Sequence, residues 1–284
     1  MGAHQHVWPV SVLCAVLGVS RSGFYASLPR HAKPAIDAQQ VALVARVKAI
    51  ALQTRHSYGS RRLAKQLQED GFHGGRAKAR RLMKEAGITV QHPKRRAPMT
   101  TDSRHGYAVA PNLLARQFDV AAPDQVWAGD ITYIWTAEGW LYLAVLLDLY
   151  SRKVVGWATS NHIDTTLGQD ALQRALERRQ PCAGLLHHAD RGSQDASHAY
   201  QDVLATCGIV GSMSEKGECL DNAVAERFFG SLKHEWTSHC HDATRQEARD
   251  DIIAYIEMFY NSKRKPSSLG YVSPNDYEKC ALVA

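Results

Sequence analysis

Three apolar runs follow one another closely in the second half of the chain, and they limit the fold more than any other feature. VWAGDITYIW begins at residue 126, WLYLAVLL follows a short turn at 136–139, and KVVGWAT follows a polar corner at 148–153. Runs of this length, separated by short polar turns, predict three strands that pair in chain order as a meander. A sheet therefore lies at the centre of this half.

Helices and strands alternate after the meander. We expect helices over 165–179 and 196–207, strands over 184–189 and 208–213, and a long helix that starts near Asp221. Strands that alternate with helices form a mixed sheet covered on both faces. The order matches the ribonuclease-H-like fold. We therefore predict an α/β catalytic core, a ribonuclease-H-like mixed sheet flanked by helices.

Charge is divided unevenly along the chain. Residues 1–120 hold 19 basic and 6 acidic side chains, net +13, whereas residues 121–284 hold 15 and 22, net −7. The overall charge of +6 hides this division. A basic half joined to an acidic half predicts that the first half binds a polyanion and the second performs another task.

Small all-α helix-turn-helix units are predicted in the basic half. Two segments each show two short helical patterns separated by a glycine: residues 10–27 with Gly18, and residues 58–90 with Gly71. A further helix is predicted between them, over 36–55, and its inward-facing residues are expected to be Val41, Val44, Ala45 and Val47. Many αα-hairpins share this outline, so a purely structural role stays open. The predicted division is a helix-turn-helix-like region at 1–56, a second basic unit at 57–91, a basic proline-containing linker at 92–122, and the core with its C-terminal helix and tail at 123–284.

Basic residues gather on one helix of the second unit. Arg76, Arg80 and Lys84 recur at i, i+4 and i+8, with Arg81 beside them and Glu85 as the single acid. A basic face that is simply solvated is the simpler interpretation. Because so few acidic side chains are present to neutralise this face, contact with phosphate groups is favoured instead. The residues predicted to bind DNA in this half are Arg61, Arg62, Arg76, Arg80, Arg81, Lys84, Lys94, Arg95 and Arg96.

Acidic residues suggest a metal site. Four Asp–Glu pairs have 35 residues between them: 102/138, 190/226, 221/257 and 242/278. This spacing alone therefore does not single out one pair. Asp190 ends the apolar run LLHHAD, and open α/β sheets place ligands at such strand ends. Asp221 precedes the long helix, where an N-cap role is the simplest account. Context therefore favours Asp190 with Glu226.

A third acid, Asp130, lies within the first strand between apolar neighbours, where a charge is costly unless something pairs with it. Counting back from the turn places Asp130 opposite about residue 145 of the second strand. Asp148, the other candidate for the third carboxylate of the site, lies about 10 Å further along that strand and is expected to cap the hairpin corner. Three carboxylates suit two Mg²⁺ (or Mn²⁺) ions and phosphodiester chemistry. Lys233, seven residues after Glu226, faces nearly the same way and is predicted to contact DNA.

Other chemistries fit the sequence poorly. The six cysteines form no C-x-x-C pair, and His234 and His239 are five residues apart rather than four, so no zinc site is expected. No glycine-rich loop for a nucleotide cofactor occurs. The longest apolar run, 140–147, is far shorter than a membrane span, and the N-terminus lacks a basic secretory leader. A cytoplasmic protein is therefore expected.

Longer segments make a specific resemblance. VWAGDITYIWTAEGWLYLAVLLDLYSRKVVGWA, LLHHADRGSQ, SMSEKGECLDNAVAERFFGSLKHE and the tail DIIAYIEMFYNSKRKPSSLGYVSP resemble the second-frame (OrfB) transposase of insertion-sequence family three. Its DDE triad carries over onto Asp130, Asp190 and Glu226, and its basic residue onto Lys233. The sequence departs from the family pattern at Ala189, Asp195 and Pro266, among others, which leaves contacts to target DNA in doubt.

The resemblance implies the activity and the partners. A transposase of this kind cleaves at the ends of its element and joins the 3′-hydroxyl to another phosphodiester, with metal ions as the cofactor. The implied partners are double-stranded DNA (terminal inverted repeats and target), further copies of the chain on that DNA, and a first-frame product of the same element. The implied location is the bacterial nucleoid. A nuclease that only hydrolyses and a non-enzymatic DNA-binding regulator remain as alternatives.

Overall fold

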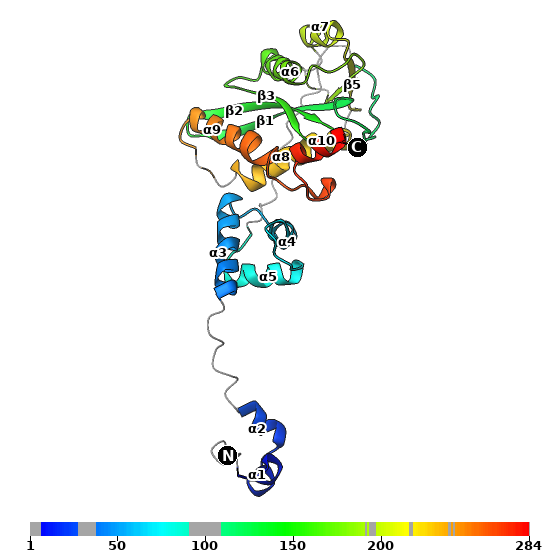
Figure 1. Cartoon of the computed structure of the whole chain (residues 1–284). Helices are drawn as coiled ribbons and strands as arrows, with labels where there is room; N and C mark the ends of the chain where they lie inside the picture. Colours follow the sequence, from blue (N-terminus) through cyan, green and yellow to red (C-terminus); the bar gives the residue numbers. More distant parts are fainter. Residues whose placement is uncertain are drawn as a thin grey trace.

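The computed structural model describes residues 7–27, 38–90, 109–190, 192, 197–215, 218–237, 240 and 242–283 (Figure 1). Six residues discussed above, Lys94, Arg95, Arg96, Asp102, Asp195 and His239, lie outside these ranges, as does most of the predicted linker. Within the described ranges, no helix combines the length and the apolar character needed to cross a membrane.

A five-stranded mixed sheet forms the centre of the second half. Its spatial order is β3-β2-β1-β4-β5. The first three strands are antiparallel neighbours, and β4 and β5 run parallel to β1. This is the order of the ribonuclease-H-like fold, and it confirms the predicted fold class. The strands are β1 (Val126–Thr136), β2 (Gly139–Asp148), β3 (Val154–Ser160), β4 (Leu186–Ala189) and β5 (Val210–Met213).

The turn between β1 and β2 fixes the register of the hairpin. Gly139 adopts φ +107°, a left-handed conformation that glycine tolerates, and its carbonyl accepts a 2.7 Å hydrogen bond from Thr136 Oγ1. Trp135 consequently lies opposite Trp140, and Asp130 lies opposite Val145. The predicted partner of Asp130 is thereby confirmed.

Helices cover both faces of the sheet. On one face, α6 (Thr165–Arg179) and α7 (His198–Thr206) pack over Leu146 and Trp127. On the other face, α8 (Ala223–Glu235), α9 (Arg245–Ile253) and the π-helical η4 (Ala254–Tyr260) pack over Leu143 and Val145. Three further elements of the described chain lie in this half: η2 (Cys219–Asn222), η5 (Ser267–Leu269) and α10 (Pro274–Val283).

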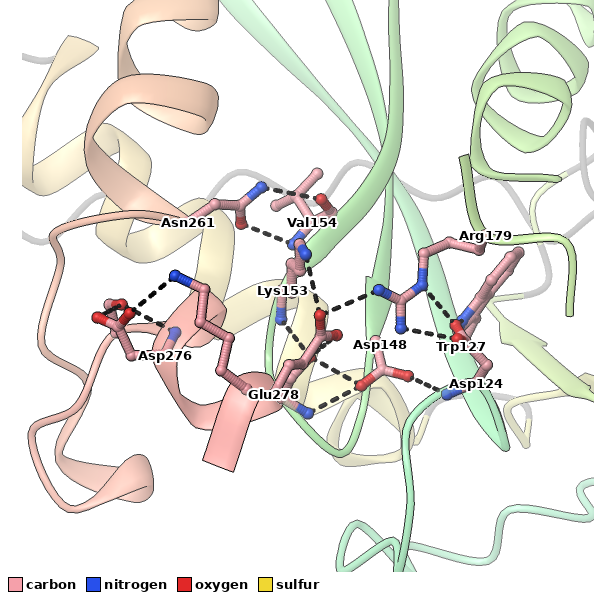
Figure 2. Close-up of polar contacts among 12 residues, drawn as sticks. Asp124, Trp127, Asp148, Lys153, Val154, Arg179, Asn261, Asp276 and Glu278 are labelled. Atoms are coloured by element: carbon pink, nitrogen blue, oxygen red, sulfur yellow. Dashed lines mark hydrogen bonds and ion pairs between the residues drawn. The ribbon is translucent and has the colours of Figure 1, made fainter. Parts of the chain in front are cut away.

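The corner between β2 and β3 is closed by the fully buried Asp148 (Figure 2). Asp148 Oδ1 accepts hydrogen bonds from the backbone and hydroxyl of Ser151, and Oδ2 accepts one from the backbone of Asp124. Glu278 of α10 joins this network through Ser151 and Arg179. Asp148 therefore caps the corner, as predicted, and ties the C-terminal helix to the sheet.

The described residues of the basic half contain five helices: α1 (Val10–Val16), α2 (Arg21–Ser27), α3 (Ala38–Gln53), α4 (Ser60–Glu69) and α5 (Arg76–Glu85). The predicted helix pairs are present. The predicted inner face of α3 is partly wrong, because Val41 is 51% exposed and the buried residues are Val47, Ile50 and Ala51. These three lie towards the C-terminal end of the helix, where α3 packs with α4 and α5. The boundary predicted after residue 56 therefore falls inside one packed unit.

The α3–α5 unit packs directly on the α8–η4 side of the sheet. Val47, Ile50 and Tyr58 belong to the same apolar cluster as residues of α8 and η4. Arg55 binds Asp251 through two hydrogen bonds of 2.8 and 3.0 Å, and its guanidinium lies 3.8 Å from the ring centroid of Trp236. Lys265 makes a 2.6 Å ion pair with Glu69. The two halves are therefore held together by both apolar and charged contacts.

Candidate active site

Asp130 lies on β1 at the point where the pairing with β4 ends. The parallel register pairs Trp127 with His187 and Ala128 with His188, and continuing it by two residues brings Asp130 level with Asp190. Side chains alternate along a strand, so Asp130 shares a sheet face with Ile134, which packs against the α8 side. Asp130 is half-buried, and its Oδ1 accepts a 2.7 Å hydrogen bond from the backbone of Ile131.

Asp190 directly follows the carboxyl end of β4. Its Oδ1 accepts a 2.9 Å hydrogen bond from the backbone of Gly192. Two buried histidines anchor the strand that carries it. His187 contacts the hydroxyl of Tyr200 at 3.0 Å, and His188 contacts the hydroxyl of Ser212 at 2.9 Å. Burial lowers the pKa of each histidine to about 4, so both are neutral near pH 7.

Glu226 lies in the first turn of α8 and is exposed. Partial burial of its carboxyl, followed by the negative charge of Asp190, raises the pKa of Glu226. The effect of the Asp190 charge on Glu226 indicates that these two acids lie within electrostatic reach of each other. The structure thus brings Asp190 and Glu226 together, and the strand register adds Asp130.

Asn222 fixes the start of α8 beside β1. Its amide Nδ2 donates a 3.0 Å hydrogen bond to the carbonyl of Gly129, the residue before Asp130. Its Oδ1 is buried and has no hydrogen-bond partner among the described residues. The residue itself is 5% exposed. Sequence reasoning did not single out Asn222, and its position directly before the helix was the only available signal.

Asp221 has a different role from the one predicted. It lies in η2, is 2% exposed, and makes a 2.7 Å ion pair with Arg116. The N-cap of α8 is instead Asn222. The N-cap interpretation of Asp221 was wrong, because Asn222 follows it as the last residue before α8 and the carboxylate of Asp221 pairs with Arg116 instead.

Lys233 lies two turns after Glu226 and is half-buried. Burial lowers the pKa of Lys233, and the negative charge of Asp130 opposes that change. Its Nζ lies 4.8 Å from the ring centroid of Tyr133. Lys233 therefore lies within electrostatic reach of Asp130.

The donors at this site suit a divalent cation. Three carboxylates are oxygen ligands of the kind that Mg²⁺ prefers, and the unpartnered Asn222 Oδ1 adds another oxygen nearby. Elsewhere in the described chain, the ligand atoms of Cys240, Asp242 and Asp251 all lie within 4.8 Å of one another. The guanidinium of Arg55 already neutralises Asp251 there, which disfavours a cation at that second cluster.

The basic face of α5 borders a groove of about 640 Å³. Arg76, Arg80 and Lys84 are exposed and line this groove together. Arg61 and Arg81 are exposed as well. No acid among the described residues makes an ion pair with any of these five side chains. The structure therefore keeps them available to an anion.

Arg62 has a different environment from its neighbour Arg61. Its Nη1 lies 2.7 Å from Oε1 of Glu235 on α8, and its guanidinium lies 5.5 Å from the ring centroid of Tyr58. Glu235 is 3% exposed and also binds Arg264 through both carboxylate oxygens. Arg62 therefore belongs to the interface between the α3–α5 unit and the sheet rather than to the open basic face.

A second hollow, a cleft of about 970 Å³, separates the α3–α5 unit from part of α8. Glu226, Arg227 and His234 line it on the helix side, and Arg62 lines it on the other. Gly59 and Val90 line both this cleft and the basic groove, so the two hollows adjoin.

Known families match most of the chain. A family described as Integrase core domain matches residues 120–219, a second of the same description matches residues 226–282, and a family described as HTH-like domain matches residues 38–96. Fold and site therefore define an integrase-type core joined to a helix-turn-helix-like domain. Domains of this class generally depend on a metal ion and act on DNA.

Individual proteins are similar over nearly the full length. The Insertion element IS600 uncharacterized 31 kDa protein of Shigella sonnei is 43% identical over 262 residues, 92% of this chain and 96% of the relative. The Transposase InsF for insertion sequence IS3A of Escherichia coli (strain K12) is 38% identical over 281 residues, 99% and 97% of the two chains. Among solved structures, the HTLV-2 integrase catalytic core domain in complex with magnesium (trimeric form) is 16% identical with a TM-score of 0.44, covering 55% of this chain and 97% of that one.

The chain belongs to the IS3 family of insertion-sequence transposases, which are DDE-type enzymes of DNA transposition. This membership confirms the family and the activity that the sequence predicted. It favours neither of the two alternatives, the hydrolytic nuclease and the non-enzymatic regulator.

Proposed function

We propose that Asp130, Asp190 and Glu226 are the catalytic residues with which this transposase cleaves DNA at the ends of its element and joins the 3′-hydroxyl to another phosphodiester. The observation that carries the proposal is the strand register that sets Asp130 level with Asp190, and the effect of the Asp190 charge on the pKa of Glu226 supports it. Three elements distant in sequence contribute these acids. A like-charge cluster of this kind is unfavourable unless it serves a cation.

The chemistry requires charge neutralisation at a phosphodiester. Two Mg²⁺ or Mn²⁺ ions held by these carboxylates would stabilise the entering and leaving oxygens of the displacement. Asp130 is held by the rigid strand β1, and Asp190 is held by its hydrogen bond from Gly192. Glu226 is exposed and can adjust its side chain to the substrate. Lys233 supplies a positive point charge for the adjoining DNA phosphate, a role that does not require bidentate geometry.

The adjoining hollows suggest the path of the bound DNA. Duplex DNA would contact Arg76, Arg80 and Lys84 on α5 and follow the cleft past Gly59 towards Glu226. Arg61 and Arg81 extend the same basic surface, because both are exposed. The fixed packing of the α3–α5 unit on α8 would hold the bound DNA in one position relative to the acids.

The DNA substrates are proposed to be the terminal inverted repeats and a target duplex. The protein itself is proposed to act in the bacterial cytoplasm, in association with the nucleoid. Further copies of the chain and a first-frame product of the same element are the proposed protein partners. The proposed division of labour assigns DNA binding to the helical first half and chemistry to residues 123–284, although the two halves share an apolar cluster.

Strand transfer with the element's own ends tests this function. The full chain is incubated with an oligonucleotide duplex of one end, a target plasmid, and either Mg²⁺ or a chelator. We expect Mg²⁺-dependent covalent joining of the end to the plasmid. Nicked ends without joined product would favour a nuclease that only hydrolyses, and binding without either product would contradict an enzymatic role.

A further inference from the structure

Two exposed tryptophans and the half-buried Tyr133 form an aromatic strip on the β1–β2 hairpin. Trp135 and Trp140 are 63% and 42% exposed and lie directly opposite each other. Their ring centroids are 4.7 Å apart in an edge-on arrangement of 74°, and Trp140 makes a similar 4.8 Å contact with Tyr133. Cross-strand ring pairs stabilise hairpins, but this role does not require two indoles to expose so much apolar surface.

The aromatic strip is continuous with the proposed catalytic site. Lys233 Nζ lies 4.8 Å from the ring centroid of Tyr133, and the charge of Asp130 acts on the same ammonium group. Tyr133 is three residues after Asp130, about 10 Å along β1 at ~3.4 Å per residue. Asp130 and Tyr133 lie on opposite faces of the sheet, because the side chains of β1 alternate, and Lys233 is the group that links them: its ammonium faces the Tyr133 ring and feels the charge of Asp130.

The flanking charges suggest the chemistry of the ligand. Lys233 lies at one end of the strip, and the half-buried Arg245 lies at the other, where its Nε donates a 3.1 Å hydrogen bond to the carbonyl of Trp140. Cations that border exposed aromatic rings suit a ligand with a negative backbone and flat, apolar faces. Single-stranded nucleic acid has this composition, and its bases stack on aromatic side chains whatever their sequence.

We propose that Tyr133, Trp135 and Trp140 bind unpaired bases of the DNA strand next to the scissile phosphate, while Lys233 contacts its backbone. This inference rests on the proposed function, since it places the strand at the acids of that site. The strip holds the strand end out of the duplex after or during cleavage. Trp135, the most exposed ring, is expected to contribute most to stacking.

Binding of the full chain to three DNA probes tests the strip, with chelator present to prevent chemistry. The probes are a blunt duplex of fixed sequence, the same duplex with a short single-stranded tail, and the same tailed duplex with abasic residues in the tail. The wild-type chain should bind the tailed duplex about tenfold more tightly than the abasic probe, in line with measured base–aromatic stacking.

Two substitutions separate stacking from folding. Trp135→Val keeps a residue that favours strands and should abolish the preference for bases in the tail, whereas Trp135→Tyr keeps a ring and should retain most of it. Both variants should bind the blunt duplex as the wild type does. Thermal unfolding of each variant checks that the hairpin still folds.

Several outcomes would overturn the inference. Equal affinity of the wild-type chain for the tailed and abasic probes would show that no base stacks. If Trp135→Val left this preference intact and instead reduced the size of the assembly in sedimentation, the rings would be a contact between copies of the chain. If the wild-type chain bound none of the three probes, the proposed DNA function itself would fail, whereas equally tight binding to all three would refute the strip alone.

Discussion

Arg61 and Arg62 are neighbours in sequence, and the structure predicts opposite consequences for their loss. Arg62 makes a 2.7 Å ion pair with Glu235 across the interface between the α3–α5 unit and α8, and its side chain is 22% exposed. Arg61 is exposed and pairs with no acid in the described part of the chain. Substitution of each by methionine keeps helix propensity and most of the aliphatic stem while removing the charge.

The expected loss of stability follows from the contacts of Arg62. A hydrogen bond to a charged group contributes ~1.5–3 kcal/mol, and a partly exposed cation–π contact contributes ~0.5–1 kcal/mol. Glu235 keeps its two hydrogen bonds from Arg264, so its carboxylate is not left unpaired. We therefore expect Arg62→Met to reduce the free energy of unfolding by about 2–3 kcal/mol, which lowers Tm by roughly 4–12 °C.

Thermal unfolding and DNA binding, measured on the same proteins, separate the two roles. Arg62→Met should lower Tm and leave the salt dependence of DNA affinity unchanged. Arg61→Met, the matched control, should leave Tm nearly unchanged and reduce the salt slope by about one, because one phosphate contact is lost. An Arg62→Met protein that melted like the wild type but lost DNA affinity and salt slope would refute the interface role of Arg62.

Three further predictions concern the strand that carries Asp190, the packing of the sheet and the lysine of the site. Burial lowers the pKa of His187 from its ordinary value of 6.5 to about 4. Between pH 6.5 and about pH 4, the imidazole of His187 is therefore protonated in the unfolded chain but not in the folded one. Stability should therefore rise with pH through this range, and acidification to about pH 5 should cost roughly 2 kcal/mol that the His187→Gln variant does not lose. A Cβ added to Gly156 would lie only 2.6 Å from the Cβ of Ala175 on α6. Gly156→Ala should therefore lower the free energy of unfolding by about 1–3 kcal/mol, measured by denaturant unfolding. A Gly156→Ala variant as stable as the wild type would contradict this close packing. Lys233→Ala should slow strand joining while Lys233→Arg retains much of it, whereas a lower Tm with a normal joining rate per folded molecule would make Lys233 structural.

Local rules made the surroundings of Asp130 predictable. Strand register depends on the length of the turn and on the alternation of side chains, so counting residues was enough to place Asp130 opposite Val145 and Asp148 at the corner. The order of strands and helices likewise followed from apolar periodicity. Strand ends alone do not account for the grouping of Asp130 with Asp190, because Asp130 lies within β1, and the family resemblance implied it instead.

Long-range packing could not be predicted in the same way. Arg62 and Glu235 are 173 residues apart, and no local pattern distinguishes Arg62 from the exposed Arg61. The inner face of α3 was misplaced because its buried residues are selected by packing against α4, α5 and the core rather than by the helix alone. Asn222 was missed for the same reason, since its partner is the Gly129 carbonyl on a distant strand.

The rate of strand joining by Glu226→Gln tests the central claim most directly. The substitution keeps the shape of an exposed side chain, so folding and DNA binding should persist. Glu177→Gln, which changes an exposed glutamate on α6, is the matched control. We expect joining per molecule of bound DNA to fall at least ~100-fold in Glu226→Gln and to remain normal in Glu177→Gln, because one metal ligand is removed in the first variant only. Near-normal Mg²⁺-dependent joining by Glu226→Gln would contradict the assignment of Asp130, Asp190 and Glu226 as one catalytic unit.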